Sequence, residues 1–394
     1  MDYQLSNRIQ KVKPSATLAI TAKAQEMRAE GIDIIGLGAG EPDFETPDHI
    51  KQAGIKAIES GFTRYTAVDG TAGLKAAIIA KFKRDNQLDY QPSQILVSSG
   101  GKQSFFNLCQ ALLNDGDEVI IPAPYWVSYP DMALLAGGVP VIVPAGLEQG
   151  FKITPEQLEG AINDKTRLFV INSPSNPSGV AYTQAELAAL GEVLLKYPQV
   201  LIASDDMYEH ILWSEEPFSN IVNAYPELYE RTFVLNGVSK AYAMTGWRIG
   251  YAAGPEPLIK AMKKVQAQST SNPNSIAQVA AEEAINGDQS CVSEMLVHFK
   301  ARHDFVVQRL NKMKGVSCLP SQGAFYSFPD MRKAIAALDG VEDDLQLADY
   351  LIEKAKVAVV PGSAFGQPGY MRISFATSME NLENALDRIE KAIS

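Results

Sequence analysis

The chain has 394 residues, of which 46% are hydrophobic and 21% charged, which is enough for about two globular domains with well-filled cores. Its net charge of −11 argues against a general electrostatic attraction to nucleic acid. Three widely spaced cysteines and four histidines form neither a disulfide framework nor a zinc motif, so no metal is expected. The N-terminal residues lack the apolar core of a signal peptide, and we expect a cytoplasmic protein with no membrane contact.

Residues 1–48 are expected to form an N-terminal arm and part of a small domain. The polar start contains Lys13-Pro14-Ser15-Ala16-Thr17 and leads into a helical pattern that Gly31 ends. An extended run then reaches the glycine-rich stretch 36–40, which Glu41 and Pro42 follow. The third glycine of a dinucleotide-binding fingerprint is missing there. We therefore interpret this stretch as a loop whose backbone can approach a ligand closely.

The next predicted elements are an amphipathic helix at 74–85 and a buried strand at 95–97. Tyr65 lies in the loop before the helix, and a tyrosine in a loop is more often a packing residue than a functional one. The strand leads into Gly100 and Gly101, and the first N–H groups of the following helix can bind an anion. Lys102 opposes the helix dipole there, which indicates a ligand for its charge, although a solvated lysine explains it equally well.

Three further strands, predicted at 118–121, 168–171 and 200–203, end in loops that carry polar or aromatic side chains. Trp126 follows the first strand and could cover a planar ring or belong to the core. Asn176 lies in the turn after the second strand. Asp205 directly follows the third and needs a cationic or N–H partner unless it is a solvated turn residue. Tyr208 comes three residues later.

The stretch 232–251 contains a lysine where open α/β sheets place their ligands. The apolar run 233–235 predicts a buried strand, and Ser239 and Lys240 follow its end. Apolar neighbours disfavour the charged form of Lys240, so part of it can be the neutral amine that attacks a carbonyl. Arg248, eight residues on, could hold a phosphate nearby. A surface lysine and arginine beside a glycine turn is an equal alternative on this stretch alone.

Strands alternate with helices from about residue 50 to 250, which predicts a large domain, 49–313, with a mostly parallel, doubly wound sheet. A long helical region with breaks runs to about residue 313. Shorter elements follow and predict an α+β domain at 314–394, with strands at 357–360 and 370–375 and a final helix at 381–393. Arg372, in the second of these strands, needs a partner if it is buried and none if its face is solvated.

Taken together, these features suit one ligand that carries a phosphate, an aldehyde, a phenolic oxygen and a ring nitrogen. A reactive amine, a phosphate-binding helix start, a ring-sized aromatic side chain and a carboxylate for a ring cation all follow strand ends along the chain. The residues are Gly100, Gly101, Trp126, Asn176, Asp205, Tyr208, Lys240 and Arg248. The ligand that matches them is pyridoxal 5'-phosphate.

The stretch 239–250, SKAYAMTGWRIG, and the turn Asn176-Pro177-Ser178-Gly179 match the cofactor-lysine motif and the N-P-T-G turn of a known family. The chain resembles the class I pyridoxal-phosphate-dependent aminotransferases, which have fold type I, along nearly its whole length. Within this class it is most similar to the bacterial aspartate aminotransferases of the Iβ type. That similarity lies in residues 13–17, 40–44, 100–103 and 124–126.

The resemblance implies a cofactor role for each matching residue. Lys240 would hold the cofactor covalently and then act as the proton shuttle. Asp205 would pair with the protonated ring nitrogen, and Tyr208 and Asn176 would contact the phenolic oxygen. Trp126 would stack on the ring, and the phosphate end would be held by Gly100, Gly101, Lys102, Ser239 and Arg248.

For the substrate, the resemblance implies contacts at both ends. Arg372 would take the α-carboxylate in a bidentate pair, with Gly40, Asn176 and Trp126 beside it. The Iα branch binds the distal carboxylate with an arginine before an S-N-P turn, but this chain has no arginine between residues 248 and 302. In the Iβ branch the lysine of the Gly-Gly-Lys helix start does this, and here that lysine is Lys102.

Three more positions bear on the site. Ser15 and Thr17 match arm residues that close over it. Tyr65 matches the tyrosine that reaches the neighbouring subunit's phosphate, which implies a homodimer with shared sites. Gly237 stands where Iα enzymes carry a phosphate-binding serine, so that contact must come from elsewhere.

We therefore expect transfer of the amino group from L-aspartate to 2-oxoglutarate, which gives oxaloacetate and L-glutamate. Lys102 together with Thr17 also matches Iβ enzymes that accept prephenate. An aromatic, alanine or other class I aminotransferase is the nearest alternative, and Lys102 weighs against alanine. A non-catalytic pyridoxal-phosphate-binding effector module is an alternative of another class. A nicotinamide oxidoreductase is disfavoured by the missing glycine fingerprint.

Overall fold

The computed structural model describes residues 3–394, and its largest element is a sheet of seven strands in the order β2-β8-β7-β6-β5-β3-β4. β8 is antiparallel to both of its neighbours, and the other strand pairs are parallel. The strands are β2 (Ile95–Ser98), β3 (Glu118–Ala123), β4 (Val139–Pro144), β5 (Thr166–Asn172), β6 (Leu201–Asp205), β7 (Thr232–Gly237) and β8 (Gly250–Ala253). This confirms the predicted α/β class with a mostly parallel sheet.

Helices cover both faces of this sheet, because its inner strands are apolar on both sides. In β7, Phe233 and Leu235 pack into one core with Phe105 of α5, and Val234 packs into a second core with Phe82 of α4. The helices are α1 (Asn7–Gln10), α2 (Ala16–Ala29), α3 (Asp48–Glu59), α4 (Ala72–Asn86), α5 (Gly101–Leu112), α6 (Ser128–Leu135), α7 (Pro155–Ala161), α8 (Gln184–Leu195), α9 (Ile221–Ala224), α10 (Glu256–Ser269), α11 (Ser275–Asn286), α12 (Ser290–Leu310), α13 (Arg332–Ile335), α14 (Asp344–Tyr350) and α15 (Met379–Ile393).

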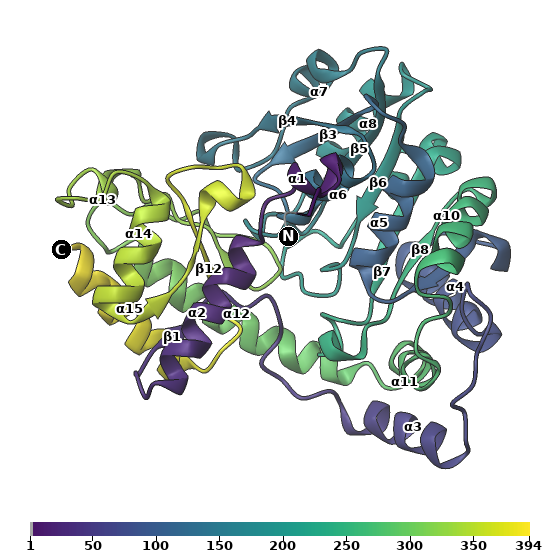
Figure 1. Ribbon diagram of the computed structural model, residues 1–394, viewed down its shortest axis with the longest axis horizontal. Coiled ribbons are helices and arrows are strands. Elements are labelled where there is room, and N and C mark those ends of the chain that lie inside the picture. Colours follow the sequence, from purple (N-terminus) through teal and green to yellow (C-terminus); the bar gives the residue numbers. More distant parts are fainter. Residues whose placement is uncertain (1–2) are drawn as a thin grey trace.

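The C-terminal elements form a separate layer beside this sheet, together with β1 (Ile35–Gly36) and α2 (Figure 1). Its strands are β9 (Tyr326–Ser327), β10 (Val357–Ala358), β11 (Val360–Pro361) and β12 (Met371–Ser374), in a three-stranded sheet β11-β12-β9 and a parallel pair β1-β10. The strand predicted at 357–360 is thus two short strands in different sheets. One face of α15 supplies Leu382, Leu386 and Ile389 to the core here. The division of the chain at residues 48 and 313 remains our proposal.

The N-terminal arm connects the two layers. It runs from α2, beside the C-terminal elements, to α1, which lies against α6 next to the large sheet (Figure 1). The carboxyl ends of β5, β6 and β7 lie at one edge of the large sheet, because these strands are parallel neighbours. Within residues 3–394, no helix combines the length and the apolar character that a membrane span requires.

Candidate active site

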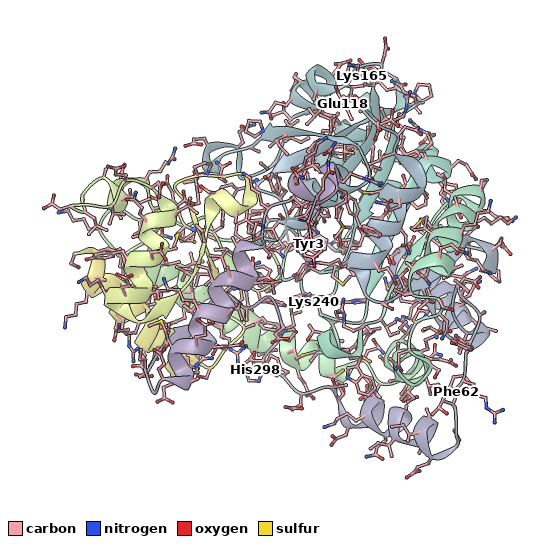
Figure 2. The ribbon with its side chains drawn as sticks, viewed as in Figure 1. Tyr3, Phe62, Glu118, Lys165, Lys240 and His298 are labelled. Atoms are coloured by element: carbon pink, nitrogen blue, oxygen red, sulfur yellow. The ribbon has the colours of Figure 1, made fainter. Side chains whose placement is uncertain are left out.

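Lys240 lies in the turn after β7, near the middle of the molecule (Figure 2). Its Nζ donates a hydrogen bond to the carbonyl of Gly40 and lies 5.9 Å and 5.8 Å from the ring centres of Tyr208 and Phe325. Burial, reinforced by the charge of Arg372, lowers the pKa of Lys240 to about 8. At pH 7 about a tenth of such an amine is neutral and nucleophilic.

The start of α5 and the side chain of Arg248 form a cradle of N–H donors. Gly100, at φ +90°, precedes the first residue of α5, and a Cβ there would lie 2.3 Å from Arg248 Nη2. A Cβ on Gly250 would lie 2.2 Å from the backbone nitrogen of Gly101. The guanidinium donates to the carbonyls of Thr245 and Ser99, at 2.9 and 3.3 Å. Glycine is therefore required where backbone and guanidinium approach, and the free helix N–H groups suit a phosphate.

Asp205 ends β6, and the hydrogen-bond partners of its carboxylate within residues 3–394 are neutral. The hydroxyl of Tyr129 donates to Oδ2, and the backbone N–H of Met207 donates to Oδ1 at 3.2 Å. Burial raises the pKa of Asp205, and these two donors together with the charge of Lys240 offset this only in part. A cationic N–H beside this carboxylate would favour its charged form.

The two tyrosines Tyr208 and Tyr326 connect the sheet edge to the C-terminal layer. Their hydroxyls are 3.0 Å apart, and both side chains are buried. A Cβ on Gly40 would lie 3.0 Å from the Tyr326 hydroxyl, so this loop glycine packs closely against it. Ser239, directly before Lys240, is also buried.

Arg372 in β12 is 2% exposed and forms no ion pair with any acidic side chain in residues 3–394. Nη1 donates to Asn176 Oδ1 at 2.9 Å and Nη2 to the carbonyl of Gly38 at 2.7 Å, while Nε is buried without a partner. The guanidinium carbon lies 4.5 Å from the ring centre of Tyr326. Burial lowers the pKa of Arg372, so an anionic ligand would relieve an unfavourable charge.

Lys102 is the second residue of α5 and is exposed, with its Nζ 5.1 Å from the ring centre of Trp126. The protein atoms that partly desolvate it and the nearby charge of Arg248 lower the pKa of Lys102. Trp126 also packs edge-on against Tyr129, at 5.2 Å between ring centres. The arm contributes Ser15, which caps α2 through a hydrogen bond from Leu18 N, and Thr17, whose buried hydroxyl has no hydrogen-bond partner in the described part of the chain.

Tyr65 is a predicted site residue that does not join the groups described above. Its side chain is 91% exposed, and Phe62, three residues earlier, lies at the periphery away from Lys240 (Figure 2). Within its own chain Tyr65 therefore contacts solvent.

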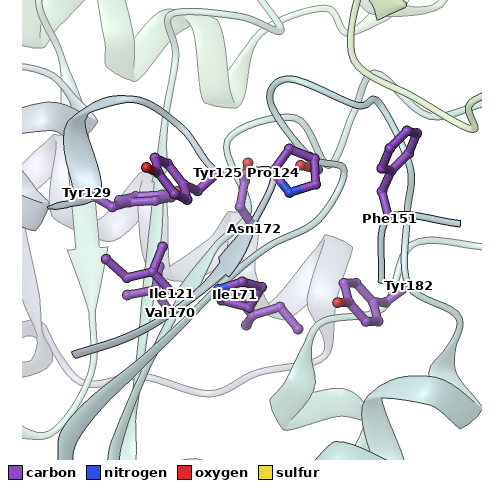
Figure 3. A pocket seen from close by; sticks show the side chains of 11 residues that line it. Ile121, Pro124, Tyr125, Tyr129, Phe151, Val170, Ile171, Asn172 and Tyr182 are labelled. Carbon is purple, nitrogen blue, oxygen red and sulfur yellow. The ribbon is translucent and has the colours of Figure 1, made fainter. Parts of the chain in front are cut away.

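A small cavity of about 20 Å³ lies behind the loops that carry Trp126 and Asn176, with room for about one water (Figure 3). Tyr129 and Asn172 line it. Asn172 donates to the backbone carbonyl of Asp205 at 2.9 Å and accepts from the backbone N–H of Asn176 at 2.8 Å. This cavity is too small for a substrate, but its lining residues fix the loops of Asp205 and Asn176.

Sequence reasoning assigned no role to Tyr129, Tyr326 or Asn172. Tyr129 lies three residues after Trp126, which is helical spacing, but nothing in the sequence connects it to Asp205, 76 positions away. Tyr326 lies in a glycine-aromatic stretch, 323–326, that could have marked a close approach of the backbone.

The residues described above fit a planar ligand with a phosphate at one end and a ring cation. The phosphate would meet Gly100, Gly101 and Arg248, and the ring cation would meet Asp205. The fold and this site define an aminotransferase of fold type I. The chain belongs to the aminotransferase class I and II family, whose model matches residues 32–389.

The relatives and solved structures that this chain is similar to are also named aminotransferases. The chain is 62% identical over 396 residues to the aspartate/prephenate aminotransferase of Nitrosomonas europaea, covering 99% of this chain and 100% of that one. It is 56% identical to the enzyme of the same name from Cereibacter sphaeroides, covering 98% of each. The crystal structure of the aspartate aminotransferase from Rhizobium meliloti superposes with a TM-score of 0.96 at 48% identity, covering 100% of this chain and 99% of that one. The aspartate aminotransferase from Thermus thermophilus with maleate gives 0.93 at 42%, covering 99% and 100%.

Proposed function

We propose that this aminotransferase uses pyridoxal 5'-phosphate to transfer the amino group of L-aspartate to 2-oxoglutarate, which gives oxaloacetate and L-glutamate. The observation that carries the proposal is a pair of cationic side chains, Arg372 and Lys102, for which residues 3–394 supply no ion-pair partner, in the site of the Lys240 amine. All four compounds are dicarboxylates, so each offers one carboxylate to each cation. The relatives named above are consistent with this choice.

The proposed cofactor site is made up of the residues around Lys240 and Asp205. When bound, pyridoxal phosphate supplies an aldehyde that takes up amines and a ring that stabilises negative charge at the substrate's Cα. Lys240 would bind the aldehyde through its neutral amine and, once released, hold and move a proton at the substrate's Cα. Asp205 would hold the ring nitrogen in its protonated form, and Tyr208 would donate to the phenolic oxygen.

At the substrate, Arg372 orients the α-carboxylate with N–H groups that it still has free. A guanidinium has five N–H groups, and two of them are used by Asn176 and Gly38, which leaves three. Lys102 would hold the distal carboxylate. Closure of the arm that carries Ser15 and Thr17 would exclude water and strengthen both ion pairs.

Prephenate is a second proposed substrate. Two relatives, at 62% and 56% identity, carry it in their names. Among residues 3–394 the buried hydroxyl of Thr17 finds no hydrogen-bond partner, so it can bond to a ligand. A polar ring substituent would give this hydroxyl a partner, which a short aliphatic substrate would not.

We also propose a homodimer in which Tyr65 reaches the phosphate of the neighbouring subunit. Tyr65 is 91% exposed, and three large apolar side chains of the same region, Ile55, Ile58 and Phe62, are exposed as well. Exposed apolar groups in one region favour burial against a partner. A cytoplasmic location remains an expectation.

Absorption spectroscopy and a substrate panel test the proposal. Purified protein should show the visible band of bound pyridoxal phosphate, and aspartate should bleach it. Steady-state kcat/KM for aspartate and glutamate should exceed that for alanine and for aromatic donors, with prephenate accepted as an amino acceptor. A band that no amino acid changes would support the effector module, and a preference for aromatic donors would support the nearest alternative enzyme.

A further inference from the structure

Lys81 of α4 and Glu209 form a buried ion pair. The two side chains are 1% and 3% exposed. Glu209 directly follows Tyr208 in the chain. Lys81 also donates to Asn86 Oδ1 at 2.7 Å. The ammonium thus lies between a carboxylate and an amide oxygen, out of contact with solvent.

The Glu209 carboxylate accepts hydrogen bonds at both oxygens. Asn86 Nδ2 donates to Oε2 at 2.8 Å, and Asn236 Nδ2 donates to Oε1 at 2.7 Å. Each amide is held in its orientation by its other end. Asn86 Oδ1 accepts from Lys81, and Asn236 Oδ1 accepts from the N–H of Gly237 at 2.7 Å. A glutamine at position 209 would offer one oxygen and one NH₂ group, so it could not accept from both amides.

This arrangement links two segments that carry site residues. Asn236 and Gly237 end β7, and Lys240 follows three residues later. On the other side, Glu209 ends the segment 205–209, which holds Asp205 and Tyr208. A buried ion pair is seldom a source of stability, because both charges lose their hydration. We therefore interpret this pair as one that positions the neighbouring site residues.

We propose that Glu209, with Lys81 as its counterion, is a positioning residue for amino-group transfer. Its carboxylate fixes Asn236, and hence the turn to Lys240, relative to the segment that carries Tyr208. The Lys240 amine and the Tyr208 hydroxyl thereby keep their relative placement around the cofactor. The inference rests on the proposed function, since it concerns the same site.

The neighbours of Glu209 do not replace it in this role. His210 Nε2 lies 3.1 Å from Asp85 Oδ2, and His210 Nδ1 lies 3.6 Å from Glu209 Oε1. These three side chains are also near enough to one another to share a metal ion. The ammonium of Lys81, which contacts Glu209 and lies 3.8 Å from Asp85 Oδ2, already supplies a cation there.

The substitution E209Q tests the proposal in the holoenzyme with aspartate and 2-oxoglutarate. We expect kcat to fall about 10- to 100-fold with KM within about threefold, as for a small misplacement of reacting groups. We also expect a shift in the pH midpoint of the visible band, which reports the Lys240–cofactor linkage. The substitution leaves unchanged the charged groups that most affect Lys240, which are Arg372, Glu41, Arg248 and Asp205.

The double variant K81M/E209Q supplies the rescue. Without Lys81, the Asn86 amide can turn over and accept from Gln Nε2, so that Gln Oε1 is free to accept from Asn236. Most of kcat and the wild-type pH midpoint should return. K152M is the matched control, because it removes the lysine of the Lys152–Glu186 pair on the surface and should change neither quantity.

Two results would overturn the proposal. One is E209Q with wild-type kcat and midpoint; the other is a loss of kcat that follows thermal stability while the midpoint stays unchanged. If E209Q does not fold, N236A decides, because it removes the amide between Glu209 and Gly237 but keeps the ion pair. Unchanged kcat and midpoint in N236A would also overturn it. Failure of the proposed function is distinct, since the wild-type protein would then lack the band or the turnover.

Discussion

Replacing Arg372 with lysine should lower kcat/KM for every amino-acid substrate by a similar factor. The guanidinium has three free N–H groups, one of them the buried and unpartnered Nε–H, so it can form two charge-assisted hydrogen bonds to an α-carboxylate. Each such bond contributes about 1.5–3 kcal/mol. Lysine keeps the charge but loses the planar fork, so we count one bond as lost. The expected decrease in kcat/KM is about 10- to 150-fold, at about 1.4 kcal/mol per factor of ten.

The assay is steady-state kcat/KM of R372K and wild type with aspartate and alanine, since both carry an α-carboxylate. The decrease should be the same for both within about threefold. The pyridoxal phosphate content should stay near the wild-type level, because Arg372 is not itself a predicted cofactor contact. Wild-type values of kcat/KM for both substrates would refute the reasoning. So would a decrease confined to aspartate, because Arg372 would then serve the distal carboxylate.

Three further predictions separate the roles of the other groups. K102M keeps an apolar chain against Trp126 but removes the charge. We expect kcat/KM for aspartate and glutamate to fall about 10-fold or more, while kcat/KM for alanine stays within about threefold of wild type. Equal decreases for all three substrates would indicate a structural role for Lys102. K240A should bind the cofactor without turnover, and mass spectrometry after borohydride treatment should find no adduct, in contrast to wild type. Because the pKa of Lys240 is lowered to about 8, the neutral amine increases as the pH rises, so the rate of cofactor attachment to apoprotein should rise through pH 8 and level off above about pH 9. A midpoint near 10.5 would mean that the amine is not perturbed.

The sequence predicted the elements of the large sheet and its helices well where the signal is local. The strand that is now β7 and the helix that is now α4 are recognisable from apolar runs and helical spacing. The short strand β8 was not predicted, because its four residues acquire strand structure only by pairing with β2 and β7. β4 was missed as well, since Pro140 and Pro144 argue against a strand, yet it lies at the sheet edge, where proline is tolerated.

For the candidate site, the sequence indicated residue types but not the contacts that those residues make with one another. The sequence left Arg372 either buried or solvated, because burial of β12 depends on β9 and β11 on its two sides. It also left Asp205 either solvated or paired, and the structure shows it partly buried with Tyr129 as its donor. Such pairings join positions far apart in sequence, and neither periodicity nor spacing encodes them.

The loop 38–40 links the positions of Arg372 and Lys240. Arg372 donates to the carbonyl of Gly38 and Lys240 to that of Gly40, so a single short loop sets the positions of both cations. The charge of Arg372 is one of the causes that lower the pKa of Lys240, after burial. A substrate carboxylate paired with Arg372 neutralises that charge, so substrate binding itself should raise the proton affinity of the Lys240 amine. The amine thus becomes the stronger base only when an amino acid is in place to give up its proton.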